Sequence, residues 1–158
     1  MIVAYTDGSA TIHGEKLGGF GVYMIDDKGY EFFYHQGYIG TKTGRMELRA
    51  IITALKVADK SQKLTIYSDS MYCINCVNKK WLWKWRDRFW EGIKNVDLVK
   101  EFFEEYQKFY FPPKLIHIKG HTNKDDIHSL GNSIADCLAN YKDQKTYLKD
   151  IYYEEIVL

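Results

Sequence analysis

The sequence is poor in cysteine and proline and has no long apolar run. Its 158 residues include 3 cysteines and 2 prolines. Three cysteines are an odd number without the pattern of a disulfide framework, which argues against a disulfide-stapled scaffold and suits a reducing compartment. Neither a secretory leader nor a membrane-spanning stretch is visible. These absences predict a cytoplasmic protein that contacts no membrane, and nothing in them implies an obligate protein partner.

Cys73 and Cys76 form a C-x-x-C pair, which is a pattern shared by zinc sites and redox enzymes. No second pair supplies the remaining ligands of a zinc site. A redox pair would stand on an exposed turn, whereas these residues fall in an apolar segment with helical spacing. We therefore predict that both are small apolar side chains of a helix.

The sequence also lacks an excess of charge of one sign, since its formal net charge is +1. Such a protein does not bind a polyanion through its overall field, so any nucleic-acid surface must gather basic residues locally. Residues 79–90 hold all 4 Trp residues of the chain, interleaved with basic side chains. We predict that this segment is a basic handle for nucleic acid, although an amphipathic helix with Trp inside and Lys outside fits the same pattern. The expected contacts are Lys80, Trp81, Lys84, Trp85, Arg86 and Arg88.

The hydrophobic residues, 46% of the chain, are patterned for one α/β domain. Residues 2–5, 18–25 and 30–39 read as three strands joined by turns, which predicts an antiparallel meander. Helical and strand-like segments then follow at 46–57, 64–67, 71–78, 96–109, 115–118 and 133–141. This order predicts a mixed five-stranded sheet, the meander plus parallel strands, with helices on both faces. The domain is expected over residues 1–142, and residues 143–158 form a tail without an assigned structure.

Two acids stand at the ends of strand-like runs with nearly the same local sequence. Tyr5-Thr6-Asp7-Gly8-Ser9 and Tyr67-Ser68-Asp69-Ser70 each place an Asp after an apolar run, a Tyr and a hydroxyl residue. If the two strands are parallel neighbours, the carboxylates lie within about 5 Å of each other. Adjacent carboxylates repel, and a hard divalent cation such as Mg²⁺ offsets that repulsion. The alternative is that each Asp only caps the element that follows it.

Two further acids lie in helical segments with apolar neighbours. Glu47 is near the start of one helix and Asp136 is near the start of another, and either could serve only to favour a helix N-terminus. Asp125 and Asp126 are rival acids, but they fall in a polar run that reads as a loop. We therefore do not expect Asp125 and Asp126 to belong to an acidic site, and the residues alone leave the roles of Glu47 and Asp136 open.

Five short motifs that contain these residues occur in order along nearly the whole chain. They are Tyr5-Thr6-Asp7-Gly8-Ser9, Gly44-Arg45-Met46-Glu47-Leu48, Tyr67-Ser68-Asp69-Ser70, Lys119-Gly120-His121 and Asn132-x-x-x-Asp136. Together they resemble the successive motifs of type 1 ribonuclease H, and residues 79–90 resemble the basic handle of its bacterial and animal members. The resemblance implies an endonuclease that hydrolyses the RNA strand of an RNA–DNA hybrid.

The resemblance also implies the chemistry of the site. Asp7, Glu47, Asp69 and Asp136 would hold two Mg²⁺ ions, for which Mn²⁺ can substitute. One ion would activate the attacking water and the other would stabilise the leaving 3′ oxygen, giving 5′-phosphate and 3′-hydroxyl ends. Phosphoryl transfer mainly requires positioning and charge neutralisation, which carboxylate-bound metal ions supply.

By the same resemblance, His121 assists turnover by moving a proton or helping product to leave. His117, within a strand, reads as structural, whereas His128 competes with His121 because it shares the expected loop, residues 122–131, which is longer than in bacterial members. Met71 replaces a polar residue that touches substrate in many members, so that contact is expected to be missing or altered. The remaining expected substrate contacts are Gly8, Ser9, Thr43, Gly44, Arg45 and Asn132.

Other classes of protein fit these motifs less well. A resolvase or an integrase core shares the expected fold, but the Lys-Gly-His motif and the basic handle argue against both. A hybrid-binding module without catalysis would have lost at least one of the four acids, and none is lost. A glycosidase also uses paired carboxylates, but it has no place for five ordered motifs.

Overall fold

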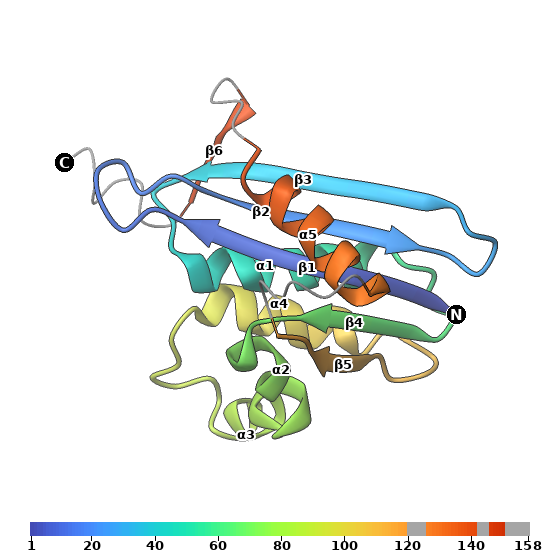
Figure 1. The fold of residues 1–158 in the computed structure, drawn as a ribbon. Coiled ribbons are helices and arrows are strands. Elements are labelled where there is room, and N and C mark those ends of the chain that lie inside the picture. Colours follow the sequence, from blue (N-terminus) through green and yellow to red (C-terminus); the bar gives the residue numbers. More distant parts are fainter. Residues whose placement is uncertain (120–125, 142–145, 151–158) are drawn as a thin grey trace.

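The computed structural model describes residues 1–119, 126–141 and 146–150, and its centre is a six-stranded mixed sheet (Figure 1). The strands are β1 (Ile2–Ala10), β2 (Gly18–Ile25), β3 (Glu31–Ile39), β4 (Leu64–Ser68), β5 (Lys114–His117) and β6 (Leu148–Lys149), in the spatial order β5-β4-β1-β2-β3-β6. Strands β1 to β3 form the antiparallel meander, and β4 and β5 add to it in parallel. The predicted fold class is confirmed, with one strand more than expected.

The extra strand comes from the segment that the sequence left unassigned. Leu148 and Lys149 pair in parallel with Tyr38 and Ile39 at the outer edge of the sheet. A strand of two residues has no periodicity of its own, so only its pairing with β3 reveals it. The described residues of the C-terminal segment therefore belong to the sheet of the domain.

Helices cover both faces of the sheet, as predicted. They are α1 (Thr43–Val57), α2 (Met71–Asn78), α3 (Trp81–Asp87), α4 (Val96–Tyr106) and α5 (Ile127–Ala139). Helix α5 crosses one face over β1 and β2, while α1 and α4 lie behind the sheet (Figure 1). Helix α1 fills the main core because its apolar residues recur at helical spacing, and Ile51 and Leu55 are completely buried. Cys73 and Cys76 are buried in α2, as the sequence predicted.

The start of α5 differs from the prediction, which placed residues 122–131 in a loop. The helix begins at Ile127, because the Asp126 carboxylate accepts a hydrogen bond from the Ser129 amide at 2.7 Å and caps it. Gly131 makes this helix hard to predict from the sequence, because glycine is a weak helix former. Its missing side chain is required here, because a Cβ atom would lie 2.5 Å from the Tyr5 ring. The assignment of Asp126 to a capping role rather than to the acidic site is consistent with this geometry.

Across the described ranges, we find no helix with the length and hydrophobicity needed to cross a membrane.

Candidate active site

Three of the four predicted acids meet at one end of the sheet. Asp7 lies on β1, and Asp69 directly follows β4, which is the parallel neighbour of β1 in the register Tyr5 to Tyr67. Glu47 reaches them from the second turn of α1. One carboxylate oxygen from each of the three lies within 4.8 Å of the other two. Strand β1 continues past Asp7 to Ala10, beyond the predicted end at Tyr5, but its parallel pairing with β4 stops at Tyr5 and brings the two acids together as the repeated sequence predicted. The role of these acids as metal ligands stays a prediction.

Glu47 is held in this group by two neighbouring residues. A Cβ atom on Gly8 would lie 2.3 Å from the Glu47 backbone nitrogen, so only glycine lets α1 pack this closely on β1. The Ser70 hydroxyl donates to the Glu47 carboxylate, and it accepts from the Cys73 amide at 3.3 Å as the cap of α2. The close approach that Gly8 permits is therefore to α1, not to a ligand on that side.

The electrostatics of the group favour a bound cation. Burial, the charge of Asp69 and a hydrogen bond with Asp136 raise the pKa of Asp7 to about 8, against a smaller lowering by the Gly8 amide. Burial raises the pKa of Glu47 to about 7, helped by the charge of Asp69 and opposed by Ser70. Such values mean that, without a cation, the group keeps protons at neutral pH because its negative charges would repel each other; a hard divalent cation prefers this kind of oxygen donor set and would displace those protons. The residues present fit Mg²⁺.

Asp136 joins the group from the opposite face of the sheet. Its carboxyl is close enough to hydrogen-bond with Asp7. Helix α5 can approach because β2 carries Gly21 beneath it: a Cβ atom there would lie 2.3 Å from the Ala135 carbonyl oxygen. The acids on β1 and α1 and Asp69 after β4 therefore form one group, and Asp136 of α5 adjoins it at Asp7.

We expect Gly21→Ala to shift α5 and its acid. The new methyl group meets backbone rather than a flexible side chain, so the helix must move, at a cost of about 1–3 kcal/mol. Urea denaturation should show that loss, and kcat on a hybrid should fall with it. Gly29→Ala is the control for an added methyl group, since a Cβ atom there meets no other atom. The positive φ of Gly29 disfavours alanine, so any loss of stability in this control comes from the backbone and not from a clash. Full activity of Gly21→Ala would contradict the close packing of α5.

Of the three histidines considered for catalysis, one lies outside the described residues and two lie within them. His121, the expected catalytic histidine, lies outside the described residues. His128 is in the first turn of α5, where its Nδ1 hydrogen-bonds with the Tyr5 hydroxyl at 2.9 Å and its ring packs 4.4 Å from the Tyr67 ring centroid. These contacts favour a structural role for His128. His117 lies in β5 with an exposed side chain.

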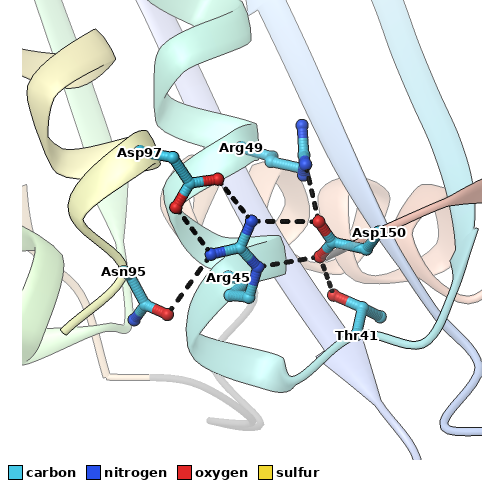
Figure 2. Close-up of polar contacts among 6 residues, drawn as sticks. All are labelled: Thr41, Arg45, Arg49, Asn95, Asp97 and Asp150. Carbon is cyan, nitrogen blue, oxygen red and sulfur yellow. Dashed lines mark hydrogen bonds and ion pairs between the residues drawn. The ribbon is translucent and has the colours of Figure 1, made fainter. Parts of the chain in front are cut away.

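The side chain of Arg45, a predicted substrate contact, is buried, so any contact of this residue with substrate is left to its backbone. It is 1% exposed, and its guanidinium lies between two carboxylates (Figure 2). Two bonds of 3.0 and 2.7 Å reach Asp97 at the start of α4, and two of 2.9 Å reach Asp150 beyond β6. Asp150 also accepts from Arg49 and Thr41. Arg45 thus ties the N-terminal end of α1 to α4 and to the C-terminal segment.

The other predicted substrate contacts lie around the acids. Thr43 is exposed at the start of α1, and the space beside Gly44 is open. Ser9 follows Asp7 on β1 and donates to Asn140 at 3.0 Å. Asn132 is 7% exposed, and its Oδ1 finds no hydrogen-bond partner among the described residues. A buried acceptor without a partner is costly, which is consistent with a place for a ligand group.

The handle, residues 79–90, contains α3 and anchors itself with its Trp residues. Trp81 and Trp85 pack against Tyr72, with ring centroids 6.3 and 6.5 Å away, so these rings are partly buried. Trp83 and Trp90 contact Phe103 of α4. The basic side chains are exposed on the surface, namely Lys79, Lys80, Lys84, Arg86 and Arg88. The two interpretations of the sequence are therefore compatible: the aromatic rings hold the segment in place and leave the cations outside.

Sequence reasoning missed three residues that organise this site: Ser70, Asn140 and Asp150. Ser70 follows Asp69, and its role as a helix cap was readable from its position before an apolar helical run. Asn140 lies one helical turn after Asp136, a spacing that places both on the same face of α5. Nothing in the local sequence marks Asp150.

Comparisons with known proteins agree with the fold. A family model described as RNase H matches residues 1–144. The ribonuclease H of Caldicellulosiruptor saccharolyticus is 34% identical over 139 residues, which cover 85% of this chain and 92% of that protein. The ribonuclease HI of Haemophilus ducreyi is 33% identical over 155 residues, which cover 95% of each chain.

Solved structures share the architecture. The native protease-reverse transcriptase of prototype foamy virus matches with a TM-score of 0.77 and 25% identity, over 87% of this chain and 20% of that longer chain. LC9-RNase H1, a type 1 RNase H with the type 2 active-site motif, matches with a TM-score of 0.73 and 23% identity, over 98% and 79%. With a family model matching most of its length and relatives above 30% identity over nearly all of theirs, this chain belongs to the RNase H family.

Proposed function

We propose that this protein is a metal-dependent endoribonuclease that hydrolyses the RNA strand of RNA–DNA hybrids and leaves 5′-phosphate and 3′-hydroxyl ends. The observation that carries the proposal is the convergence of Asp7, Glu47 and Asp69, with Asp136 in hydrogen-bond contact with Asp7. These are the four acids of the family motifs, and they come from four separate segments of the chain. No other described group of acids in the chain offers three ligand atoms so close together.

The four carboxylates would hold two Mg²⁺ ions, or Mn²⁺ in their place. The bound cations supply an attacking water at neutral pH and neutralise the charge of the leaving 3′ oxygen. The protein's own contribution is placement: Gly8 and Ser70 fix Glu47, and the packing of α5 on Gly21 fixes Asp136. His121 is proposed to help protons or product leave.

Substrate recognition is proposed to depend on the shape of the hybrid and on the 2′-hydroxyl groups of its RNA strand. Ser9, Thr43, Gly44 and the buried amide of Asn132 lie on the same strand or helices as the acids and would offer polar groups to the RNA. For Gly8 and Arg45, only backbone atoms remain as possible contacts, because the side chain of Arg45 is buried. The basic handle would hold the DNA strand through its phosphates.

A cleavage assay with four substrates tests the function. Labelled RNA–DNA hybrid, RNA duplex, DNA duplex and single-stranded RNA are incubated with Mg²⁺ or with EDTA, and the ends of the products are mapped. We expect cleavage of the RNA in the hybrid alone, only with the metal, and with 5′-phosphate ends. Cleavage of the DNA duplex at the same rate, or cleavage that persists in EDTA, would contradict the proposal.

For the handle, we expect Lys84→Ala combined with Arg88→Ala to weaken hybrid binding and to reduce its salt dependence. Both side chains are exposed, whereas Arg86 pairs with Asp87 and is left unchanged. Each lost phosphate contact should lower the slope of log K against log salt by about 0.9, so the double variant should lose about two units. Binding is measured in Ca²⁺ or EDTA so that no cleavage occurs.

The matched control for the handle is Lys28→Ala combined with Lys114→Ala, which removes two exposed cations from other parts of the surface. This variant has the same net charge as the handle variant. A salt slope in the handle variant equal to that of the control would show that α3 is only a structural element.

A further inference from the structure

Helix α5 carries two amides on the same face as its acid. Asn132, Asp136 and Asn140 are spaced by four residues, so they line one side of the helix. Asn140 is the residue that caps the C-terminal end. Its Nδ2 donates to the Asp136 carbonyl oxygen at 2.9 Å, which is a capping contact, and also to the Asp136 carboxylate Oδ1 at 3.1 Å. A helix cap needs only the bond to the backbone carbonyl oxygen, so the bond to the Asp136 carboxylate has another role.

The orientation of the Asn140 amide is itself fixed from the sheet. The Ser9 hydroxyl donates to Asn140 Oδ1 at 3.0 Å, so the NH₂ group must face Asp136. Ser9 lies two residues after Asp7 on β1. Through Ser9 and Asn140, the acid on α5 is therefore tied to the strand that carries its partner acid.

Asp136 needs such a restraint more than the other acids do. It lies in the last turns of a helix, beside a carboxyl that repels it whenever both are ionised. A cavity of about 160 Å³ borders Ser9, Asn140 and Tyr147, so the amide has room to turn away once the Ser9 bond is lost. A hydrogen bond from an NH₂ group to a carboxylate is charge-assisted and sets the direction of its remaining lone pairs.

We propose that Asn140 is a positioning residue that aims the Asp136 carboxylate at the bound divalent cation, and that Ser9 sets the orientation of Asn140. The inference rests on the proposed function for its effect on turnover, but not for its effect on cation binding. Groups that hold a metal ligand in place typically contribute about 10–100-fold to metal affinity or activity.

The test compares Asn140→Ala and Asn140→Asp with the wild type. Mg²⁺ binding is measured by calorimetry without nucleic acid, and kcat and KM are measured on a hybrid. We expect Asn140→Ala to weaken Mg²⁺ binding and to lower kcat by about 10–100-fold, with little change in KM. Asn140→Asp should be worse, since it replaces the donor with a second negative charge. Ser133→Ala, an exposed site on the same helix, is the control.

A double-mutant cycle isolates the part played by Ser9. Ser9→Ala should weaken Mg²⁺ binding in the wild-type background and have little further effect in Asn140→Ala, because the relay is already broken. Equal effects of Ser9→Ala in both backgrounds would mean that Ser9 does not act on Asp136 through Asn140. If Asn140→Ala lowers the melting temperature but leaves Mg²⁺ binding and kcat unchanged, Asn140 is a helix cap alone. If Mg²⁺ binding depends on Asn140 but the wild type cleaves no hybrid, the proposed function is refuted and the positioning role of Asn140 stands.

Discussion

Asp7→Asn and Asp69→Asn should each remove nearly all hybrid cleavage without unfolding the protein. Each substitution takes one carboxylate from the group in which three acids offer oxygens within 4.8 Å. Stabilisation of charge at phosphorus by bound metal ions amounts to several kcal/mol, so losing it should lower kcat by more than about 10³-fold. Single-turnover cleavage at saturating Mg²⁺ measures the effect. Asp27→Asn, in an exposed turn, is the matched control.

The same substitution should change how the stability of the metal-free protein depends on pH. The folded protein holds the Asp7 proton up to a pKa of about 8, whereas the unfolded chain releases it near the ordinary value of 3.8. The wild type should therefore lose stability as the pH rises from about 4 to about 8, and Asp7→Asn should lose less. Thermal unfolding in EDTA at several pH values across this window shows the difference. Parallel curves for the two proteins, or near-normal turnover of the variant, would place the site elsewhere.

The sheet and the acidic group were predictable because their signals are local and repeated. Asp7 and Asp69 each follow an apolar run and a Tyr, and a strand end with that sequence is recognisable wherever it occurs. Once β1 and β4 are parallel neighbours, the proximity of the two acids follows from the strand spacing alone. The position of Glu47 also follows from a local pattern, the helical periodicity of α1.

The start of α5 was not predictable from periodicity. Asp126 and Gly131 both read as loop residues, yet one caps the helix and the other makes room for Tyr5. Their roles are visible only when α5 lies on β1, more than a hundred residues away in the chain. Tertiary contact here overrides the local preference of the sequence.

The burial of the Arg45 side chain was also not predictable from local sequence patterns. Arg45 is an expected substrate contact by its place in a catalytic motif, and its sequence neighbours give no sign that its side chain is buried. Its actual partners are Asp97 and Asp150, which lie 52 and 105 residues away. A long-range ion pair leaves no pattern in a single sequence, so neither Asp150 nor β6 was foreseen.

We expect Asp150→Ala to be the most destabilising of the single substitutions described above. The Asp150 carboxylate is 1% exposed and accepts hydrogen bonds from Arg45, Arg49 and Thr41 (Figure 2). Removing it leaves the buried Arg45 guanidinium with one carboxylate in place of two. Removing one partner of a buried ion pair costs about 3–5 kcal/mol, because the remaining charge stays out of water. Urea denaturation measures the loss.

Asp97→Ala is the matched control, since Asp97 bonds the same guanidinium with two hydrogen bonds. Its side chain is 45% exposed, so water can replace it at Arg45, and solvent already screens the pair. We therefore expect Asp97→Ala to cost clearly less than Asp150→Ala, although both remove one carboxylate from one arginine. Equal losses would mean that burial does not govern the network. A loss below about 1 kcal/mol for Asp150→Ala would mean that the C-terminal segment does not hold α1 in place.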